Sequence, residues 1–202
     1  MENLHIVYNS LLKSLDEVVD IMKYNKGIQH VITERLSFEK WFQVELLNRL
    51  LLNDDMNTYS IEDSKILNGT SKRQSIDLTV NGKIGIELKI ITTNYEVDNK
   101  IVKKRIKNIS DNFYSLISDF NRMSELENQF GISFIYPFPI DKKHKNYKDF
   151  EKQLNKINSK YYIKFTNYSS EYNSLIFVLH NIDSIEIYSE YPLNNNMNLI
   201  KL

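Results

Sequence analysis

The fold of this 202-residue chain is decided by the stretch Ser75-Ile76-Asp77-Leu78-Thr79-Val80-Asn81-Gly82-Lys83-Ile84-Gly85-Ile86-Glu87-Leu88-Lys89-Ile90. It predicts two short strands joined at Asn81-Gly82, because this dipeptide tolerates the positive φ that a two-residue hairpin turn requires. Side chains alternate between the two faces of a strand, so Glu87 and Lys89 share one face and the flanking apolar residues take the other. Asp77, on the partner strand, is expected to converge on the face of Glu87 and Lys89.

Composition excludes several classes of protein. Lysine plus arginine and aspartate plus glutamate each number 26, so no global positive field indicates nucleic acid, and a nucleic-acid surface has to be local. The absence of cysteine excludes disulfides, thiolate metal ligands and cysteine nucleophiles. The N-terminus lacks a signal-peptide pattern, and no apolar run reaches the roughly 18 residues of a membrane span. We therefore expect a cytoplasmic protein with no membrane partner.

Upstream of the hairpin the sequence predicts two helices. Apolar residues recur at helical spacing from Asn3 to Tyr24, in a helix that ends before Gly27. Ser37 is expected to cap a second helix, which runs to Leu52. That helix is apolar nearly all round, which predicts burial, so its polar residues need a reason to be there. A short strand is expected at about 58–61.

Downstream of the hairpin a long helix is expected from about Lys100 to Phe130, ended by Gly131. Its first turns carry a basic stripe at spacing i, i+3, i+4 and i+7, made of Lys100, Lys103, Lys104 and Lys107. Alone, such a stripe is a solvated helix face, whereas beside a phosphodiester site it is a candidate for contact with backbone phosphate. Further strands are expected at about 132–136, 161–165, 175–180 and 184–188, and a further helix at 147–158. The order predicts an α/β protein with a single domain, 1–202, whose N-terminal helical segment covers about 1–30.

Asp77 and Glu87 are the candidate metal ligands. Mg²⁺ and Mn²⁺ are held by one or two carboxylates together with phosphate oxygens and water. Lys89 would lie beside the metal-bound water, where its charge lowers the pKa of that water or stabilises the transition state, and a general-base role stays open. An ordinary hairpin with exposed charges is the alternative, but it does not explain charges on the inner face of a strand flanked by isoleucines.

These residues resemble the PD-(D/E)XK nuclease superfamily, which includes restriction endonucleases, Holliday-junction resolvases and recombination exonucleases. The resemblance covers roughly Ser37 to Tyr136 and is carried by Asp77 and the triplet Glu87-Leu88-Lys89, between a helix with a glutamate and a helix with lysines. Ile76 stands where the name motif has proline. The resemblance implies a restriction-endonuclease-like core, in which helices flank a central mixed sheet.

A metal site is also implied by this resemblance. The segment Phe38–Leu47 resembles the opening helix of Mrr-like members, in which a Phe-Glu pair precedes an apolar run, and this favours Glu39 over Glu45 as the helix-borne ligand. The implied ligand set for Mg²⁺ or Mn²⁺ is Asp77, Glu87, the backbone carbonyl of Leu88, and Glu39 or Glu45.

We therefore expect a metal-dependent phosphodiesterase that cleaves DNA in restriction, phage defence or repair, with RNA still open as a substrate. A homodimer is expected only by analogy with relatives that cut both strands. The alternative is a catalytically inactive, nuclease-like subunit that serves as an interaction module or scaffold. Neutral net charge and the lack of a recognisable sequence-reading domain keep this alternative open.

Overall fold

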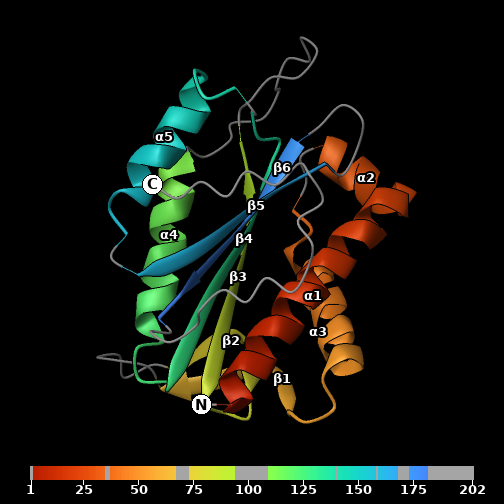
Figure 1. Ribbon diagram of the computed structural model, residues 1–202, viewed down its shortest axis with the longest axis vertical. Helices are drawn as coiled ribbons and strands as arrows, with labels where there is room; N and C mark the ends of the chain where they lie inside the picture. The colour runs from red at the N-terminus through yellow and green to blue at the C-terminus, as the bar shows by residue number, and fades with distance from the viewer. Residues whose placement is uncertain are drawn as a thin grey trace.

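A six-stranded sheet lies between two layers of helices (Figure 1). The computed structural model describes residues 2–34, 37–66, 73–93, 109–139, 141–157, 159–167 and 173–181. Within them the strand order is β1-β2-β3-β4-β6-β5. The prediction of an α/β protein with a central mixed sheet flanked by helices is therefore confirmed. None of the described helices is long and apolar enough to span a membrane.

The described helices cover both faces of the sheet (Figure 1). The first layer contains α1 (Glu2–Tyr24), α2 (Lys26–Thr33) and α3 (Glu39–Asn53), and the second contains α4 (Ile109–Arg122) and α5 (Lys145–Leu154). The strands are β1 (Tyr59–Ile66), β2 (Arg73–Val80), β3 (Ile84–Thr92), β4 (Asn128–Tyr136), β5 (Lys160–Asn167) and β6 (Asn173–His180).

The first three strands form an antiparallel meander, after which α4 crosses over and β4 pairs parallel to β3. A parallel neighbour requires such a crossover, because a tight turn can join only antiparallel strands. β6 then lies between β4 and β5 and is antiparallel to both. The middle of the chain therefore runs as helix, three-stranded meander, helix and parallel strand.

Alternation along β3 and β4 divides the core into two layers. Leu88 and Phe134 pack with α1 and α3, whereas Ile91 and Ile135 pack with α4 and α5. The apolar stripe of α1 is buried in the first layer, as its helical spacing predicts.

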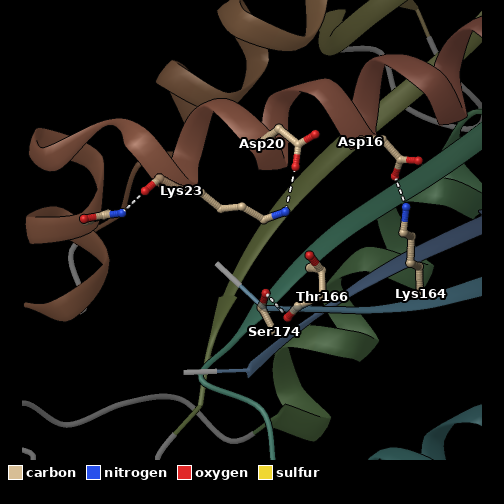
Figure 2. A network of polar contacts seen from close by, with 7 residues as sticks. Asp16, Asp20, Lys23, Lys164, Thr166 and Ser174 are labelled. Carbon is tan, nitrogen blue, oxygen red and sulfur yellow. Dashed lines mark hydrogen bonds and ion pairs between the residues drawn. The ribbon is translucent and has the colours of Figure 1, made fainter. Parts of the chain in front are cut away.

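Polar contacts tie α1 to the edge of the sheet, as Figure 2 shows. Lys164, on the edge strand β5, pairs with Asp16 of α1. Farther along α1, Lys23 pairs with Asp20 at 2.6 Å, and the backbone carbonyl of Lys23 accepts a hydrogen bond from Gln29 of α2. The long helix is thus fixed both to the sheet and to the helix that follows it.

The hairpin turn is as the sequence predicts in conformation but not in length. Asn81 and Gly82 have φ of 51° and 64°, which these two residue types tolerate best. Val80 pairs with Ile84, so three residues separate the paired positions instead of two. The side chain of Asn81 also accepts a hydrogen bond from the N–H of Thr58 at 2.8 Å, which anchors the turn to the segment before β1.

Several boundaries differ from those predicted. Phe38, not Ser37, occupies the N-cap position of α3 and makes no side-chain capping bond. Helix α4 ends at Arg122, and Gly131 lies inside β4, beneath Leu116 and Phe120 of α4. Helix α2 was not expected. The expected strands at 58–61, 132–136, 161–165 and 175–180 are present, mostly longer, whereas the segment 184–188 lies outside the described residues.

Helix α3 is less buried than its composition predicts. Its inner face buries Phe42, Leu46 and Leu50, while Val44 and Leu52 are 56% and 68% exposed. An apolar circumference therefore does not mean burial on all sides here, because only one face of α3 meets the sheet and α1.

Candidate functional site

The candidate site lies where β2 and β3 part. Within the described strands, their pairing runs from the turn only as far as Leu78 opposite Ile86. Beyond this point β2 continues beside β1, and β3 continues beside β4. The edge of β3 that faces β2 therefore carries backbone groups that no strand pairs, and such groups require other partners.

Two carboxylates supply those partners. Asp77 accepts a hydrogen bond from the N–H of Leu88 at 2.8 Å, and Glu39 accepts one from the N–H of Ile90 at 3.0 Å. Because the N–H and C=O of one strand residue point to the same side, the Leu88 carbonyl also faces this opening. Asp77, Glu39 and the Leu88 carbonyl thus gather along one short edge.

Helix α3 holds both strands at this opening. Gln43, which is buried, donates a hydrogen bond to the backbone carbonyl of Asp77 at 2.6 Å. Glu39 and Gln43 are four residues apart and so lie on the same face of the helix. One turn of α3 therefore contacts β2 through Gln43 and β3 through Glu39. These contacts account for the two polar residues on the face of α3 that meets the sheet.

On the other face of the sheet, Glu87 and Lys89 lie under α4. Lys89 lies 3.8 Å from a carboxylate oxygen of Asp119, and Asp119 also pairs with Arg122 one turn along the helix. Our sequence interpretation missed Asp119 and Arg122. Their i, i+3 spacing was the only local signal, and it does not tell which strand residues α4 covers.

Burial and negative neighbours determine the charge of Glu87, which is only 8% exposed. Its pKa is raised to about 9, first because burial disfavours the charged carboxylate and then because Asp77 and Asp119 repel it, while Arg122 acts in the opposite direction. Glu87 therefore carries a proton at neutral pH, beside the carboxylate of Asp77.

Ser133 adds a polar atom to this face. It is paired with Lys89 across the parallel strands and is fully buried, so the two side chains leave the sheet on the same side. Its hydroxyl has no hydrogen-bond partner among the described residues. Buried polar groups rarely stay unpaired, so this hydroxyl is an exception in the core beside Lys89.

A second lysine flanks the opening from the α3 side. Lys40 pairs with Glu62 of β1 and lies 3.1 Å from the side-chain oxygen of Gln43. The pKa of Lys40 is raised, first by the hydrogen bond to Glu62 and also by the negative charges of Asp77 and Glu39. Lys40 therefore lies within the electric field of the two site carboxylates.

The backbone at Glu62 departs from regular strand geometry. Its φ is 50°, which is uncommon for a residue other than glycine. The pairing of β1 with β2 is regular on both sides, through Ile61 with Leu78 and Asp63 with Ile76, and omits only Glu62 and Asp77. The strained residue is thus directly across from the aspartate of the candidate site, and strained backbone clusters at functional sites.

Of the residues predicted from the sequence, Asp77 and Glu39 lie at the β3 edge of the opening. Glu87 lies beside Asp77 on the α4 face of the sheet, and Lys89 contacts Asp119 on that face. Glu45 instead accepts a hydrogen bond from Arg49 at 3.0 Å, within α3 itself. The lysine stripe of residues 100, 103, 104 and 107 lies outside the described residues.

No group of three or more His, Cys, Asp and Glu residues within the described ranges is arranged to hold a metal ion. Mg²⁺ needs fewer protein ligands than that, because it keeps several waters and takes one or two carboxylates together with substrate phosphates. Asp77 and Glu87 supply two carboxyl groups of the required kind.

No model of a known protein family matches the chain, and no curated protein or solved structure shows significant similarity to it. The function is therefore inferred from the chemistry of the site.

Proposed function

We propose that this protein is a Mg²⁺- or Mn²⁺-dependent nuclease that cleaves DNA, with a site of the PD-(D/E)XK type. The observation that carries the proposal is the gathering of Asp77, Glu87 and Lys89, with the helix carboxylate of Glu39, at the point where β2 and β3 part. The helix, meander, helix and parallel strand around these residues support a restriction-endonuclease-like core. A setting in restriction, phage defence or repair is part of the same proposal.

The donor set fits a hard divalent cation. Burial, and then the charges of Asp77 and Asp119, raise the pKa of Glu87, so that Glu87 holds a proton when no metal is bound. A cation that replaces this proton would relieve the repulsion between Asp77 and Glu87. Once bound, the metal supplies a water of lowered pKa and offsets charge on the phosphate oxygens.

The protein's own residues position the reacting groups. The N–H of Leu88 holds the Asp77 carboxylate at the edge of β3, which fixes one metal ligand. Asp119 keeps the Lys89 ammonium on the face of Glu87, where it stabilises the negative charge that develops on the phosphate in the transition state. Glu39, which accepts the hydrogen bond from the Ile90 N–H, would serve the outer shell of the metal from the helix side.

Cleavage assays test this proposal. Plasmid, linear duplex, single-stranded DNA and RNA are incubated with Mg²⁺ or Mn²⁺ and with the native protein, Asp77→Asn, Lys89→Ala or Glu45→Gln. We expect cleavage of DNA by the native protein and a loss of about 100-fold or more in the first two variants, as when one transition-state donor or metal ligand is removed.

Glu45→Gln is the matched control, because Glu45 is a helix carboxylate that pairs with Arg49 outside the opening. It should cleave like the native protein. Equal rates in all four proteins would sink the site assignment, and no metal-dependent cleavage of any substrate would favour the inactive scaffold.

A further inference from the structure

Lys40 and Glu62 form an exposed pair at the opening between β2 and β3, and the proposed nuclease mechanism does not use it. The Lys40 side chain is 70% exposed, whereas that of Lys89 is 29% exposed. Lys40 follows Glu39 directly in α3 and is linked through Gln43 to the backbone of Asp77. A cation in this position can be reached by a polyanion that approaches the two carboxylates.

We propose that Lys40 binds a DNA backbone phosphate beside the one that is cleaved, and that Glu62 competes with this phosphate for Lys40. The inference rests on the proposed function. Lys89 contacts Asp119 on the α4 face of the sheet, whereas Lys40 extends from α3 and contacts Gln43, which holds the backbone carbonyl of Asp77. Lys40 is therefore a second cation near the site carboxylates, and it is the more exposed of the two lysines. Pairing with Glu62 keeps Lys40 extended and neutralised until a phosphate replaces the carboxylate.

The geometry of Glu62 distinguishes this pair from an ordinary surface ion pair. A residue at φ 50° in the middle of a strand costs of the order of 1 kcal/mol or more, and exposed ion pairs contribute little to stability in return. The strain falls opposite Asp77 and presents the carboxylate to Lys40. The ion pair of Glu62 does not offset the cost of its strained backbone, and a functional role explains why the strain is present.

The chain offers a matched control pair of similar exposure. Lys83 and Glu127 pair at 2.8 Å beside the hairpin turn, with side chains 63% and 61% exposed, against 70% and 53% for Lys40 and Glu62. The variants are Lys40→Met and Glu62→Gln, and the controls are Lys83→Met and Glu127→Gln.

Kinetics with duplex DNA and Mg²⁺ give the first readout. We expect Lys40→Met to raise KM about fivefold with kcat nearly unchanged, because the lost contact holds ground state and transition state alike. Glu62→Gln should lower KM about twofold, because the competing carboxylate is gone. The control variants should match the native protein in both constants. Unchanged KM in Lys40→Met, or a rise in KM in Glu62→Gln, would overturn the inference.

Fluorescence anisotropy in EDTA gives a second readout that requires no catalysis. The slope of log Kd against log salt should fall by about 1 in Lys40→Met, as expected when one phosphate contact is lost, and should stay unchanged in Lys83→Met. An effect on RNA of the same sequence but not on DNA would contradict the assignment. If the native protein does not cleave, the proposed function fails, while the binding measurements still decide whether Lys40 holds phosphate.

Discussion

His180 makes the free energy of unfolding depend on pH. Its ring is buried at the end of β6 and lies edge-on to Tyr8 of α1, with centroids 5.7 Å apart. Burial lowers the pKa of His180 to about 4, and the positive charge of Lys160 contributes in the same direction. Between about pH 6.5 and 4 this histidine therefore binds more protons in the unfolded chain than in the folded protein, so its contribution to stability falls as pH falls, by roughly 3 kcal/mol. The raised pKa of Glu87 acts in the opposite direction over the same pH range.

Urea unfolding at pH 7 and pH 4.5 measures this effect. The free energy of unfolding at pH 7 minus that at pH 4.5 should be about 2 kcal/mol lower in His180→Leu than in the native protein, because this variant has no imidazole to protonate. His30→Leu is the control, because His30 lies on the exposed side of α2. An equal pH dependence in native protein and His180→Leu would show that other groups carry it.

At the residue scale, local rules were enough to relate Glu87 to Lys89, because the period of two acts within one strand. The choice between Glu39 and Glu45 could not be made in this way, since only the docking of α3 decides which one meets the Ile90 N–H. The role of Asp119 was even harder to predict from the sequence. Asp119 meets Lys89 through a crossover whose length and direction no residue spacing encodes.

The packing of α4 and of the turn that follows it on the sheet depends on glycine at one position more than at another. A Cβ at Gly85 would lie 2.6 Å from side-chain atoms of both Met123 and Leu126, whereas a Cβ at Gly131 would meet Leu116 and Phe120 at 3.4–3.5 Å, an ordinary contact. We expect Gly85→Ala to destabilise the protein by about 1 kcal/mol, because two packed side chains must move. Gly131→Ala should be neutral or slightly stabilising.

Thermal or urea unfolding of the two variants checks this comparison. Each variant serves as the control for the other, because Gly131 lies in a strand under α4 and Gly85 lies in the neighbouring strand under the turn after α4. A greater loss in Gly131→Ala than in Gly85→Ala would contradict the packing described. A shift of α4 in Gly85→Ala should also move Asp119 relative to Lys89 and so slow cleavage, given the proposed function.

At the scale of helices and strands, a sequence pattern predicted an element correctly where a single physical cause produces the pattern. The apolar stripe predicted α1 well, because its spacing reflects burial of a single face. Gly131 misled the assignment of α4, since a glycine can lie inside a strand as well as end a helix. The exposed apolar residues of α3 show the same ambiguity, because composition does not say which side of a helix meets the core.

For the whole molecule, a bound cation should act as a stabilising ligand. At a metal concentration 100 times Kd, mass action adds about 2.7 kcal/mol, which in a protein of this size raises Tm by roughly 5–10 °C. We expect such a rise with Mn²⁺ in the native protein and in Glu45→Gln, and none in Glu87→Gln, which lacks one carboxylate. Differential scanning fluorimetry measures it. An inactive scaffold without a metal site predicts no rise in any of the three.

The class of fold followed from the sequence, but the strand order did not. Helices and strands in mixed succession predict α/β, and the hairpin predicts that β2 and β3 are neighbours. No local sequence pattern predicts that β6 lies between β4 and β5. That order depends on which of the two strands in the β5–β6 pair forms hydrogen bonds with β4. The two faces of the sheet were likewise not assignable to particular helices.

The pairing between β2 and β3 is short, and this links local opening of the sheet to ligand binding. These strands pair at three register positions, whereas β3 and β4 pair at nine. Native proteins open first where few backbone hydrogen bonds join neighbouring segments. The β2–β3 pairing is the backbone pairing that joins β1 and β2 to the rest of the described sheet. Each opening parts Asp77 from the Leu88 N–H, so only molecules with the β2–β3 pairing closed have both carboxylates in place. The apparent affinity for a metal or a DNA strand is then the intrinsic affinity scaled by the closed fraction.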